Sequence, residues 1–365
     1  MGLALEQARM GLFLTSPNPR VGCVLVSESG EILGEGHTQQ AGGPHAEIMA
    51  LRDAELKGHL TTGATAYVTL EPCCHYGRTG PCCDALISAG IKKVVASIAD
   101  PNPLVSGQGF ERLRAAGVEV IIGPGAAASR ELNIGFFSRM IRKKPWVRMK
   151  IAASLDGRTA LENGSSQWIT SDASRTDGHI WRARACAVLT GIGTVLHDRP
   201  RLDVRLTKTP RQPHLAVVDG RLETPTDSPV FISGRTLFIY AATQNDERRR
   251  ALEAHGATVI IPPNDSIDRS TRVDLPTMLC DLASKGINEL HVEAGQRLNG
   301  SLVQEGLVDE FVVYLAPKLI GLGQDMVRFG PLSQLSQAVG LEFISTTMLG
   351  TDLQVIARVK SHNRF

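Results

Sequence analysis

Two short segments of the chain carry residue types that bind transition metals. They are residues 44–47, which read PHAE, and residues 72–83, which read PCCHYGRTGPCC. One histidine nitrogen and two cysteine sulfurs form a usual zinc ligand set, and three protein ligands leave the fourth tetrahedral position to water. Bound zinc is a Lewis acid that lowers the pKa of such a water. The two segments therefore predict a catalytic metal site.

The spacing of His45 and Glu47 separates their roles. Residues i and i+2 of a regular helix point about 200° apart because a turn holds about 3.6 residues. In the first turn of a helix that faces a cavity, one side chain can hold the metal while the other reaches over it. We expect His45 to be a ligand and Glu47 to be the catalytic proton carrier. If His75 were a fourth ligand, the site would be closed and structural, and Glu47 would have no function.

Four cysteines compete for the two sulfur positions. Cys73 and Cys82 each follow a proline, and Cys82 opens a predicted helix of residues 82–89. The start of a helix lowers the pKa of a thiol, which favours the thiolate that a metal needs. We therefore expect Cys73 and Cys82 to be the ligands. Cys74 and Cys83 are expected to be small buried thiols.

The metal segments belong to a series of motifs that extends over nearly the whole chain. In order, these are residues 15–22 (TSPNPRVG), 44–47, 71–82, 100–103 (DPNP), 154–158 (SLDGR), 166–170 (SQWIT) and 292–295 (VEAG). The series resembles the bifunctional pyrimidine deaminase/reductases of riboflavin biosynthesis. The long segment between the two ligand cysteines separates this family from cytidine deaminases.

The resemblance implies an α/β protein with two domains. Residues 1–143 would form a three-layer, cytidine-deaminase-like domain that is a zinc-dependent pyrimidine deaminase. Residues 146–365 would form a doubly wound, dihydrofolate-reductase-like domain that binds NADPH. The implied reactions are hydrolytic deamination of 2,5-diamino-6-ribosylamino-4(3H)-pyrimidinone 5′-phosphate and reduction of 5-amino-6-(5-phosphoribosylamino)uracil to the ribitylamino product. One zinc ion per chain and NADPH are the expected cofactors.

The resemblance also implies binding residues, position by position. The substrate contacts in the first domain would be Asn18, Arg78, Asp100 and Asn102. Those in the second would be Ser166, Arg182, Leu202, Arg205 and Glu293. The cofactor contacts would be Ala152, Trp168, Thr194, Asp198, Gly295, Gln296, Arg297, Leu298, Asn299, Gly300 and Ser301. Arginine suits a sugar phosphate because its guanidinium can pair two phosphate oxygens, and backbone N–H groups at the helix start after Glu293 suit a cofactor phosphate.

Structural interpretations stay open for several of these positions. The predicted contacts of the first domain are of residue types that are common in turns. Residues 293–301 would also form an ordinary strand-to-helix turn. Trp168 would also serve as a core residue, and Asp198 would also cap a turn. The chain departs from the family pattern at Thr38, where histidine is frequent, and at Gly80, where a second proline is common.

The alternation of strand and helix patterns predicts a three-layer α/β unit for the first part, with a hairpin at residues 21–36. We expect the first helix to reach Leu14 and the basic residues 139–144 to lie in a solvated linker. In the second part, we expect helices to start near Trp181 and at Gly300. A mostly parallel, doubly wound sheet is expected for the second part.

Composition limits the other functions. The 365 residues have a net charge of +2 and 5% aromatic residues, which argues against a nucleic-acid deaminase with a basic, aromatic-lined channel. No stretch reaches the roughly 18 apolar residues of a membrane span. Seven cysteines do not form a disulfide framework and suit a reducing cytoplasm. Two alternative functions remain: a nucleoside or nucleic-acid deaminase with an appended domain, and a zinc-stabilised binding protein. A homo-oligomer is compatible with the sequence.

Overall fold

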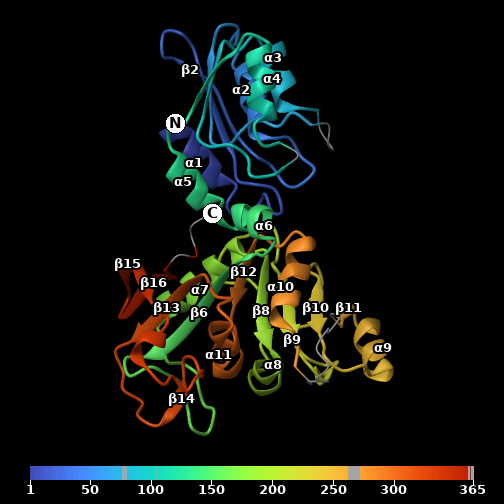
Figure 1. The fold of residues 1–365 in the computed structure, drawn as a ribbon, viewed down its shortest axis with the longest axis vertical. Helices are drawn as coiled ribbons and strands as arrows, with labels where there is room; N and C mark the ends of the chain where they lie inside the picture. Colours follow the sequence, from blue (N-terminus) through green and yellow to red (C-terminus); the bar gives the residue numbers. More distant parts are fainter. Residues whose placement is uncertain (76–79, 104, 262–271, 361, 363–365) are drawn as a thin grey trace. The chain divides into compact units, whose positions relative to one another are not determined.

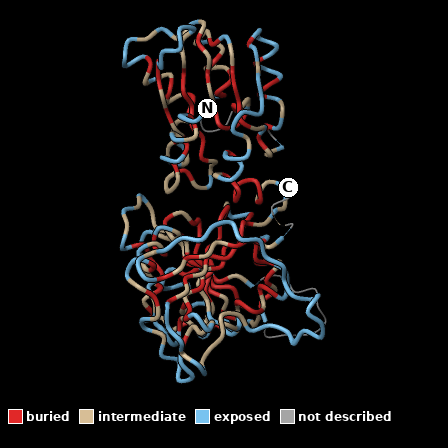
Figure 2. The backbone as a smooth tube through the Cα atoms, turned by 90° about the vertical axis from the view of Figure 1, so that its left-hand side faces the viewer, coloured by how far each residue is buried: buried red, intermediate tan, exposed pale blue. Residues whose placement is uncertain are grey.

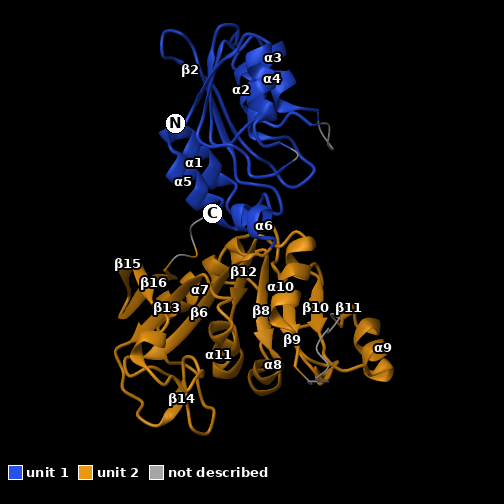
Figure 3. Ribbon diagram, in the orientation of Figure 1, with its two compact units in different colours: residues 1–143 blue, residues 144–365 orange. Residues whose placement is uncertain are grey.

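The computed structural model describes residues 1–75, 80–103, 105–261, 272–360 and 362. The chain divides into two compact units, Met1–Lys143 and Lys144–Phe365 (Figure 3). The predicted contact Arg78 lies outside the described residues. Within the described ranges, no helix has the length and apolar character that crossing a membrane requires.

The first unit is built on a five-stranded sheet with strand order β2-β1-β3-β4-β5. Figure 1 labels its edge strand β2 and the helices α1 to α6 of this unit. The strands are β1 (Gly22–Val26), β2 (Ile32–His37), β3 (Thr65–Val68), β4 (Lys93–Ala96) and β5 (Glu119–Ile122). Strand β1 pairs antiparallel with β2 and β3, and the pairs β3–β4 and β4–β5 are parallel. The helices are α1 (Gly2–Met10), α2 (Ala46–Leu56), α3 (Cys82–Ser88), α4 (Gln108–Ala115), α5 (Ala126–Leu132) and α6 (Ile134–Arg142).

Helix α2 is held unusually close to strand β2. A Cβ atom at Gly34 would lie 2.3 Å from the Ala50 carbonyl oxygen, and one at Gly36 would lie 2.5 Å from the Ala50 amide nitrogen. Only glycine allows the two backbones to approach in this way, and the helix presents small buried residues, Ala46, Ala50 and Ala54, to the strand. This contact fixes the start of α2, where His45 lies.

The end of the first unit differs from the sequence-based prediction. The first helix stops at Met10 and does not reach Leu14. Four of the six residues at 139–144, expected in a linker, belong to helix α6, so this interpretation is wrong. The reason is that α6 buries Ile134, Phe136 and Phe137, and this apolar face outweighs the solvation of a basic run on the other face.

The second unit contains a nine-stranded sheet with order β11-β10-β9-β8-β12-β6-β13-β16-β15. Its strands are β6 (Trp146–Ser154), β8 (Ala187–Gly191), β9 (His214–Val218), β10 (Leu237–Tyr240), β11 (Ala257–Ile260), β12 (Glu289–Val292), β13 (Glu310–Ala316), β15 (Leu341–Leu349) and β16 (Asp352–Val359). A separate pair joins β7 (Arg158–Leu161) to β14 (Gly323–Asp325). The helices are α7 (Asp172–Arg184), α8 (Ile192–Asp198), α9 (Asp246–Ala254), α10 (Leu275–Ser284) and α11 (Gln296–Gln304), with a short 3₁₀ turn at Leu335–Gln337.

The expected parallel arrangement holds for most of this sheet, but one end is antiparallel. Strands β13 to β6 and onward to β11 run parallel, whereas β16 pairs antiparallel with both β13 and β15. The hairpin β15–β16 was not predicted. Two helix starts were also wrong: α7 begins at Asp172, where the Ser171 hydroxyl accepts the Ser174 N–H, and α11 begins at Gln296.

Central strand β6 has an apolar face and a charged face. Alternate residues from Val147 to Ala153 enter the main hydrophobic core. On the other face the buried Arg148 guanidinium bonds Glu289 at 2.9 Å and also bonds Glu310. Arg184 bonds Glu289 at 2.8 Å, and Arg358 bonds Glu310 at 2.8 Å. The result is a buried network of three arginines and two glutamates.

Candidate active sites

The predicted zinc ligands come together at two helix starts. His45 immediately precedes α2, and Cys82 is the first residue of α3, while Cys73 lies in the loop after β3. One ligand atom of each of these residues lies within 4.8 Å of the others. The His45 Nδ1 is 3.5 Å from the Cys73 Sγ and 3.3 Å from the Cys82 Sγ.

These separations fit a zinc ion. With Zn–S bonds of about 2.3 Å and Zn–N bonds of about 2.0–2.1 Å, tetrahedral angles place nitrogen and sulfur roughly 3.5 Å apart. The donor set also fits the preference of zinc for imidazole and thiolate ligands. The residues present can therefore hold the metal.

The two ligand thiols differ in acidity. A hydrogen bond from the Cys82 thiol holds the pKa of Cys73 well below its usual value. The same hydrogen bond, together with burial, raises the pKa of Cys82. The Cys82 backbone N–H adds a donor to the Cys73 Sγ at 3.4 Å. Metal binding requires both sulfurs as thiolates, so it must release the proton of the Cys82 thiol.

The other two cysteines of the segment engage protein acceptors. The buried Cys83 Sγ donates to the Pro72 carbonyl at 3.2 Å and to the Gly109 carbonyl at 3.5 Å. Cys74 is partly exposed and not buried as expected, and its Sγ contacts the Gln108 Oε1 at 3.9 Å. This placement agrees with the choice of Cys73 and Cys82 as ligands.

Glu47 lies in the first turn of α2, next to the ligand cluster. Its side chain is buried, and burial, with a smaller contribution from the charge of Cys73, raises its pKa to about 7. A carboxyl group with such a pKa can both accept and donate a proton near neutral pH. Glu47 therefore has the position and the acidity of a proton carrier.

The sequence-based prediction missed the role of Glu71, the residue before the first metal-binding Pro-Cys pair. Its buried carboxylate accepts backbone N–H groups of Asp100 at 3.1 Å, Gly107 at 3.0 Å and Gly109 at 2.9 Å. Glu71 thus holds the segment that carries Asp100 and Asn102. A charged residue at the end of a buried strand was the available signal.

The predicted substrate contacts of the first unit lie in turns, as their types indicated. The Asp100 Oδ1 accepts the Asn102 N–H at 2.8 Å, and burial raises the Asp100 pKa to about 7. Glu71 follows β3 and Asp100 follows β4, and the two parallel strands end at the same sheet edge. Asn18 lies in a separate turn, where its carbonyl accepts the Thr15 hydroxyl at 3.1 Å.

In the second unit, Glu293 is the centre of a charged cluster at the end of β12. Its two carboxylate oxygens accept the Nε–H and an Nη–H of Arg182, and the Lys150 Nζ lies 3.7 Å from it. Burial opposes ionisation, but the Arg182 and Lys150 charges outweigh it and hold the Glu293 pKa well below its usual value. Lys150, on β6, was not predicted as a site residue because its partner lies on another strand.

The two arginines expected to suit a sugar phosphate differ in their surroundings. Arg182 is mostly buried and already bonded to Glu293 and to the Asp203 carbonyl at 3.0 Å. The guanidinium of Arg205 is about half exposed and bonds the Asp203 carboxylate at 2.7 Å. The Arg205 N–H also donates to the His179 Nδ1 at 3.1 Å. Of the two arginines, Arg205 is the better placed to meet a phosphate.

The predicted cofactor cradle forms the start of α11. Gly295 precedes the helix, and a Cβ built on it would lie 4.0 Å from the Thr194 Oγ1. Asn299 and Gly300 face inward: the Asn299 Nδ2 donates to the Met326 carbonyl at 3.1 Å, and a Cβ at Gly300 would lie 1.8 Å from the Arg328 carbonyl oxygen. The part of this segment that can bind a phosphate is therefore the backbone at the start of α11, at Gln296, Arg297 and Leu298. The Ser301 hydroxyl donates to the Arg297 carbonyl.

The remaining predicted contacts are spread over three segments. Trp168 is 60% exposed, so it is not core, and the Arg175 guanidinium stacks 4.5 Å from its ring centre. Leu202 is buried in a core cluster, which leaves only its backbone for substrate. Asp198 ends α8, and burial raises its pKa. Partly buried positions hold Ser166, in the loop before Trp168, and Ala152, on β6.

Two family models match the chain. The cytidine and deoxycytidylate deaminase zinc-binding region matches residues 1–98, and the RibD C-terminal domain matches residues 145–355. The riboflavin biosynthesis protein RibD of Escherichia coli is 44% identical over 367 residues, which is 97% of this chain and 96% of that protein. The chain belongs to the RibD family. RibD of Aquifex aeolicus is 41% identical over 97% of this chain and 96% of that protein.

Solved structures of RibD proteins agree with this assignment. Acinetobacter baumannii RibD, form 1, has a TM-score of 0.88 at 38% identity and covers 98% of this chain and 97% of that chain. The diaminohydroxyphosphoribosylaminopyrimidine deaminase/5-amino-6-(5-phosphoribosylamino)uracil reductase of Thermotoga maritima has a TM-score of 0.86 at 33% identity, with the same coverage.

Membership in the RibD family confirms several expectations from the sequence. The chain is a bifunctional deaminase and reductase of riboflavin biosynthesis, with a cytidine-deaminase-like part and a RibD C-terminal part. Zinc and NADPH are its cofactors. The alternatives of a nucleic-acid deaminase and of a zinc-stabilised binding protein are thereby set aside.

Proposed function

We propose that residues 1–143 form the deaminase domain and residues 146–365 the reductase domain. The first converts 2,5-diamino-6-ribosylamino-4(3H)-pyrimidinone 5′-phosphate to its deaminated product, and the second reduces the ribosyl group of that product to ribityl. The observation that carries the proposal is the cluster of His45, Cys73 and Cys82 with the buried Glu47 beside it.

His45, Cys73 and Cys82 hold the zinc ion in the deaminase domain. When bound, zinc supplies Lewis acidity that makes water a nucleophile near neutral pH. Glu47 accepts the proton of the attacking water and then delivers protons to the pyrimidine ring nitrogen and to the leaving ammonia. Because Glu47 is buried, its carboxyl is shielded from bulk water during these transfers.

Substrate contacts complete the deaminase site. Asp100 and Asn102 form one turn that Glu71 holds in place, so their side chains have a fixed position relative to the metal segment. Asn18 contributes from a second turn, and Arg78 is proposed to bind the substrate phosphate.

In the reductase domain, the NADPH phosphates bind at the start of α11, and Thr194, Asp198, Ala152 and Trp168 complete the cofactor site. Hydride chemistry belongs to NADPH, and the protein's part is to place the nicotinamide C4 near the sugar C1′.

Two groups of residues hold the reductase substrate. Glu293, kept ionised by Arg182, presents a carboxylate acceptor. Arg205 meets the phosphate, while Ser166 and the Leu202 backbone form the rest of the substrate pocket. Since the zinc ligands need reduced thiols, we also propose that the protein works in the cytoplasm.

The deaminase assignment can be tested by replacing Glu47 with glutamine. Glu47→Gln should retain zinc and lower deamination by about 10²- to 10⁴-fold, as expected for a lost general acid–base. Reduction of the deaminated intermediate by the same preparation should be unchanged, and the exposed Glu55→Gln on the same helix serves as the control. Loss of zinc from Glu47→Gln would make Glu47 a ligand and refute the mechanism.

A further inference from the structure

One loop of the second unit is held in place by side chains and not by regular structure. It consists of residues 199–205, which follow helix α8, and we call it the Leu202 loop. Figure 2 shows buried backbone in the interior of the second unit and exposed backbone around it. The Leu202 loop contains both: Leu202 and Asp203 are buried, whereas Arg201 and Arg205 are exposed. A buried centre therefore presents two guanidinium groups at the surface.

The backbone of the Leu202 loop adopts a conformation that side chains rarely allow. Arg199 has a φ of 43° and Leu202 has a φ of 50°. A positive φ is uncommon for residues with a Cβ, and it persists where the surrounding structure holds it. The Leu202 side chain is fixed in a core cluster with Leu222 and Val230. Its peptide groups need partners of their own.

Arg235, which lies just before strand β10, supplies these partners. Its Nη1 donates to the Leu202 carbonyl at 2.7 Å, and its Nη2 donates to the Arg201 carbonyl at 2.6 Å and to the Val230 carbonyl at 3.1 Å. One guanidinium thus joins the left-handed residue to the segment that precedes β10. Lysine, with a single nitrogen, cannot reproduce this fork of donors.

The end of the loop is fixed by other side chains. The Gln212 side chain bonds both the N–H and the carbonyl of Val204, at 2.7 Å and 2.9 Å. The Arg205 N–H donates to the His179 Nδ1 at 3.1 Å. These contacts hold the end of the loop, and Arg235 holds its middle. Together they give the Arg205 side chain a defined origin.

The charges at the loop favour an anion. The Asp203 carboxylate bonds Arg201 at 2.9 Å and Arg205 at 2.7 Å, so two guanidiniums share one negative charge. Arg235 has no ion-pair partner among the residues that the structure describes. Burial lowers the pKa of Arg235 to about 10, so this group still carries its charge near neutral pH. The surplus of positive charge suits a phosphate group, which carries about −1.5 to −2 charges at pH 7.

We propose that Arg235 is a positioning residue of the reductase site. It fixes the peptide groups of Arg201 and Leu202 so that the guanidinium of Arg205 faces the substrate phosphate. Its three hydrogen bonds go to protein carbonyls, so it acts through the loop and not on the substrate itself. The inference rests on the proposed function, because the substrate contact of Arg205 belongs to that proposal.

The test is the steady-state kinetics of reduction by the zinc-loaded full-length protein with NADPH. Each preparation is given the phosphorylated and the dephosphorylated intermediate, and the readout is the ratio of the two kcat/KM values. An unfolded fraction lowers both values equally and cancels from the ratio, whereas a displaced phosphate site lowers the first value alone. Arg235→Lys keeps the charge and should lower the ratio by about 10- to 100-fold, the loss that a displacement of about 1 Å can cause. The loss should lie mainly in KM.

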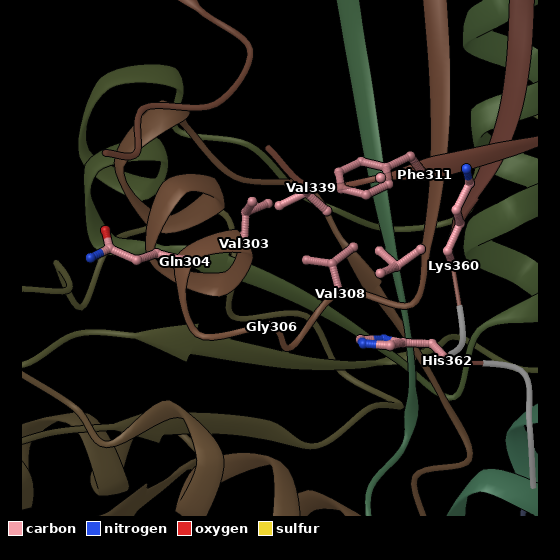
Figure 4. Close-up of a pocket in the computed structure, with 10 residues that line it drawn as sticks. Val303, Gln304, Gly306, Val308, Phe311, Val339, Lys360 and His362 are labelled. Atoms are coloured by element: carbon pink, nitrogen blue, oxygen red, sulfur yellow. The ribbon is translucent and has the colours of Figure 1, made fainter. Parts of the chain in front are cut away.

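Two control variants come from the same unit. Arg248→Lys is matched, because Arg248 donates to the carbonyls of Leu222 at 2.9 Å and Thr224 at 2.7 Å, and Leu222 also has a positive φ of 59°. Lys360→Ala removes a positive charge at the pocket of about 390 Å³ shown in Figure 4, and none of the described residues that line this pocket belongs to the Leu202 loop. Both variants should keep the wild-type ratio.

Comparison with Arg205→Ala separates this inference from the proposed function. If Arg235 acts through Arg205, the double variant Arg205→Ala/Arg235→Lys should have nearly the ratio of Arg205→Ala alone, because the two effects are then not additive. A wild-type ratio in Arg235→Lys together with a lowered ratio in Arg205→Ala would overturn the inference and leave the proposed phosphate contact standing. A wild-type ratio in Arg205→Ala would overturn both. Losses that multiply in the double variant, or an equal loss in Arg248→Lys, would also overturn the inference.

Discussion

Glu71→Gln replaces the carboxylate that holds the segment beside the zinc site. The two oxygens of Glu71 accept three backbone N–H groups, from Asp100, Gly107 and Gly109, at 2.9–3.1 Å. An amide of the same shape offers a single oxygen. It can keep the two bonds from Asp100 and Gly107 in weakened form, but its NH₂ then faces the Gly109 N–H, a donor facing a donor.

The free-energy cost follows from these three contacts. A hydrogen bond to a charged group contributes about 1.5–3 kcal/mol, and a buried donor without an acceptor costs about 1–3 kcal/mol. One lost bond and two weakened ones give about 2–4 kcal/mol. For a unit of this size that corresponds to a fall in Tm on the order of 10 °C.

The assay follows each activity after heating, because one unfolding free energy is not well defined for a chain with two domains. After a fixed time at a series of temperatures, deamination by Glu71→Gln should be lost about 10 °C earlier than in the wild type. Reduction by the same sample should be lost at the wild-type temperature. Glu55→Gln, exposed on α2, is the matched control and should change neither activity.

Two results would refute this reasoning. If both activities of Glu71→Gln lost heat resistance equally, the effect would not be confined to the segment that Glu71 holds. If deamination kept its wild-type heat resistance, the three N–H groups would not depend on a charged acceptor.

Three further predictions concern the zinc, the pH dependence and the phosphate. Cys82→Ser should lose most of its zinc while Cys83→Ser keeps it, as measured by metal analysis; the reverse result would exchange their roles. Burial and the nearby guanidinium charges hold the His179 pKa at about 4, so the unfolded chain binds this proton first as pH falls. The resistance of the reductase activity to heating should therefore be full above about pH 6.5 and should decline toward pH 4. If a His179→Gln variant showed the same decline, His179 would not be its cause. Arg205→Ala should lower kcat/KM for reduction of the phosphorylated intermediate by about 10- to 150-fold and barely affect the dephosphorylated one; equal losses on both would make Arg205 structural.

The deaminase site could be predicted from sequence because its chemistry is local. His45 and Glu47 lie two residues apart, and each ligand cysteine follows a proline, so residue type and spacing were sufficient. Glu71 was missed because its acceptor role depends on N–H groups that lie 29 to 38 residues away. Only the fold brings these groups to one carboxylate.

In the second unit, more of the site depends on contacts between residues that are far apart in the sequence. The sequence predicted a mostly parallel sheet here, but the pairing of Glu293 with Arg182 joins residues 111 positions apart. Lys150 gave no signal within its own strand. The β15–β16 hairpin was missed because β15 does not alternate apolar and polar residues as a strand with one buried face does.

The buried network around Arg148 also has a consequence for how the second unit folds. Because side chains alternate along a strand, a one-residue slip of β6 would turn Arg148 into the apolar core. A two-residue slip would keep the faces but move the guanidinium roughly 7 Å from Glu289 and Glu310 on the flanking strands. Only one register of β6 therefore leaves no buried charge unpaired. Lys150 lies on the same strand. The ion pairs of Arg148 with Glu289 and Glu310 therefore also set the position of Lys150 along the sheet.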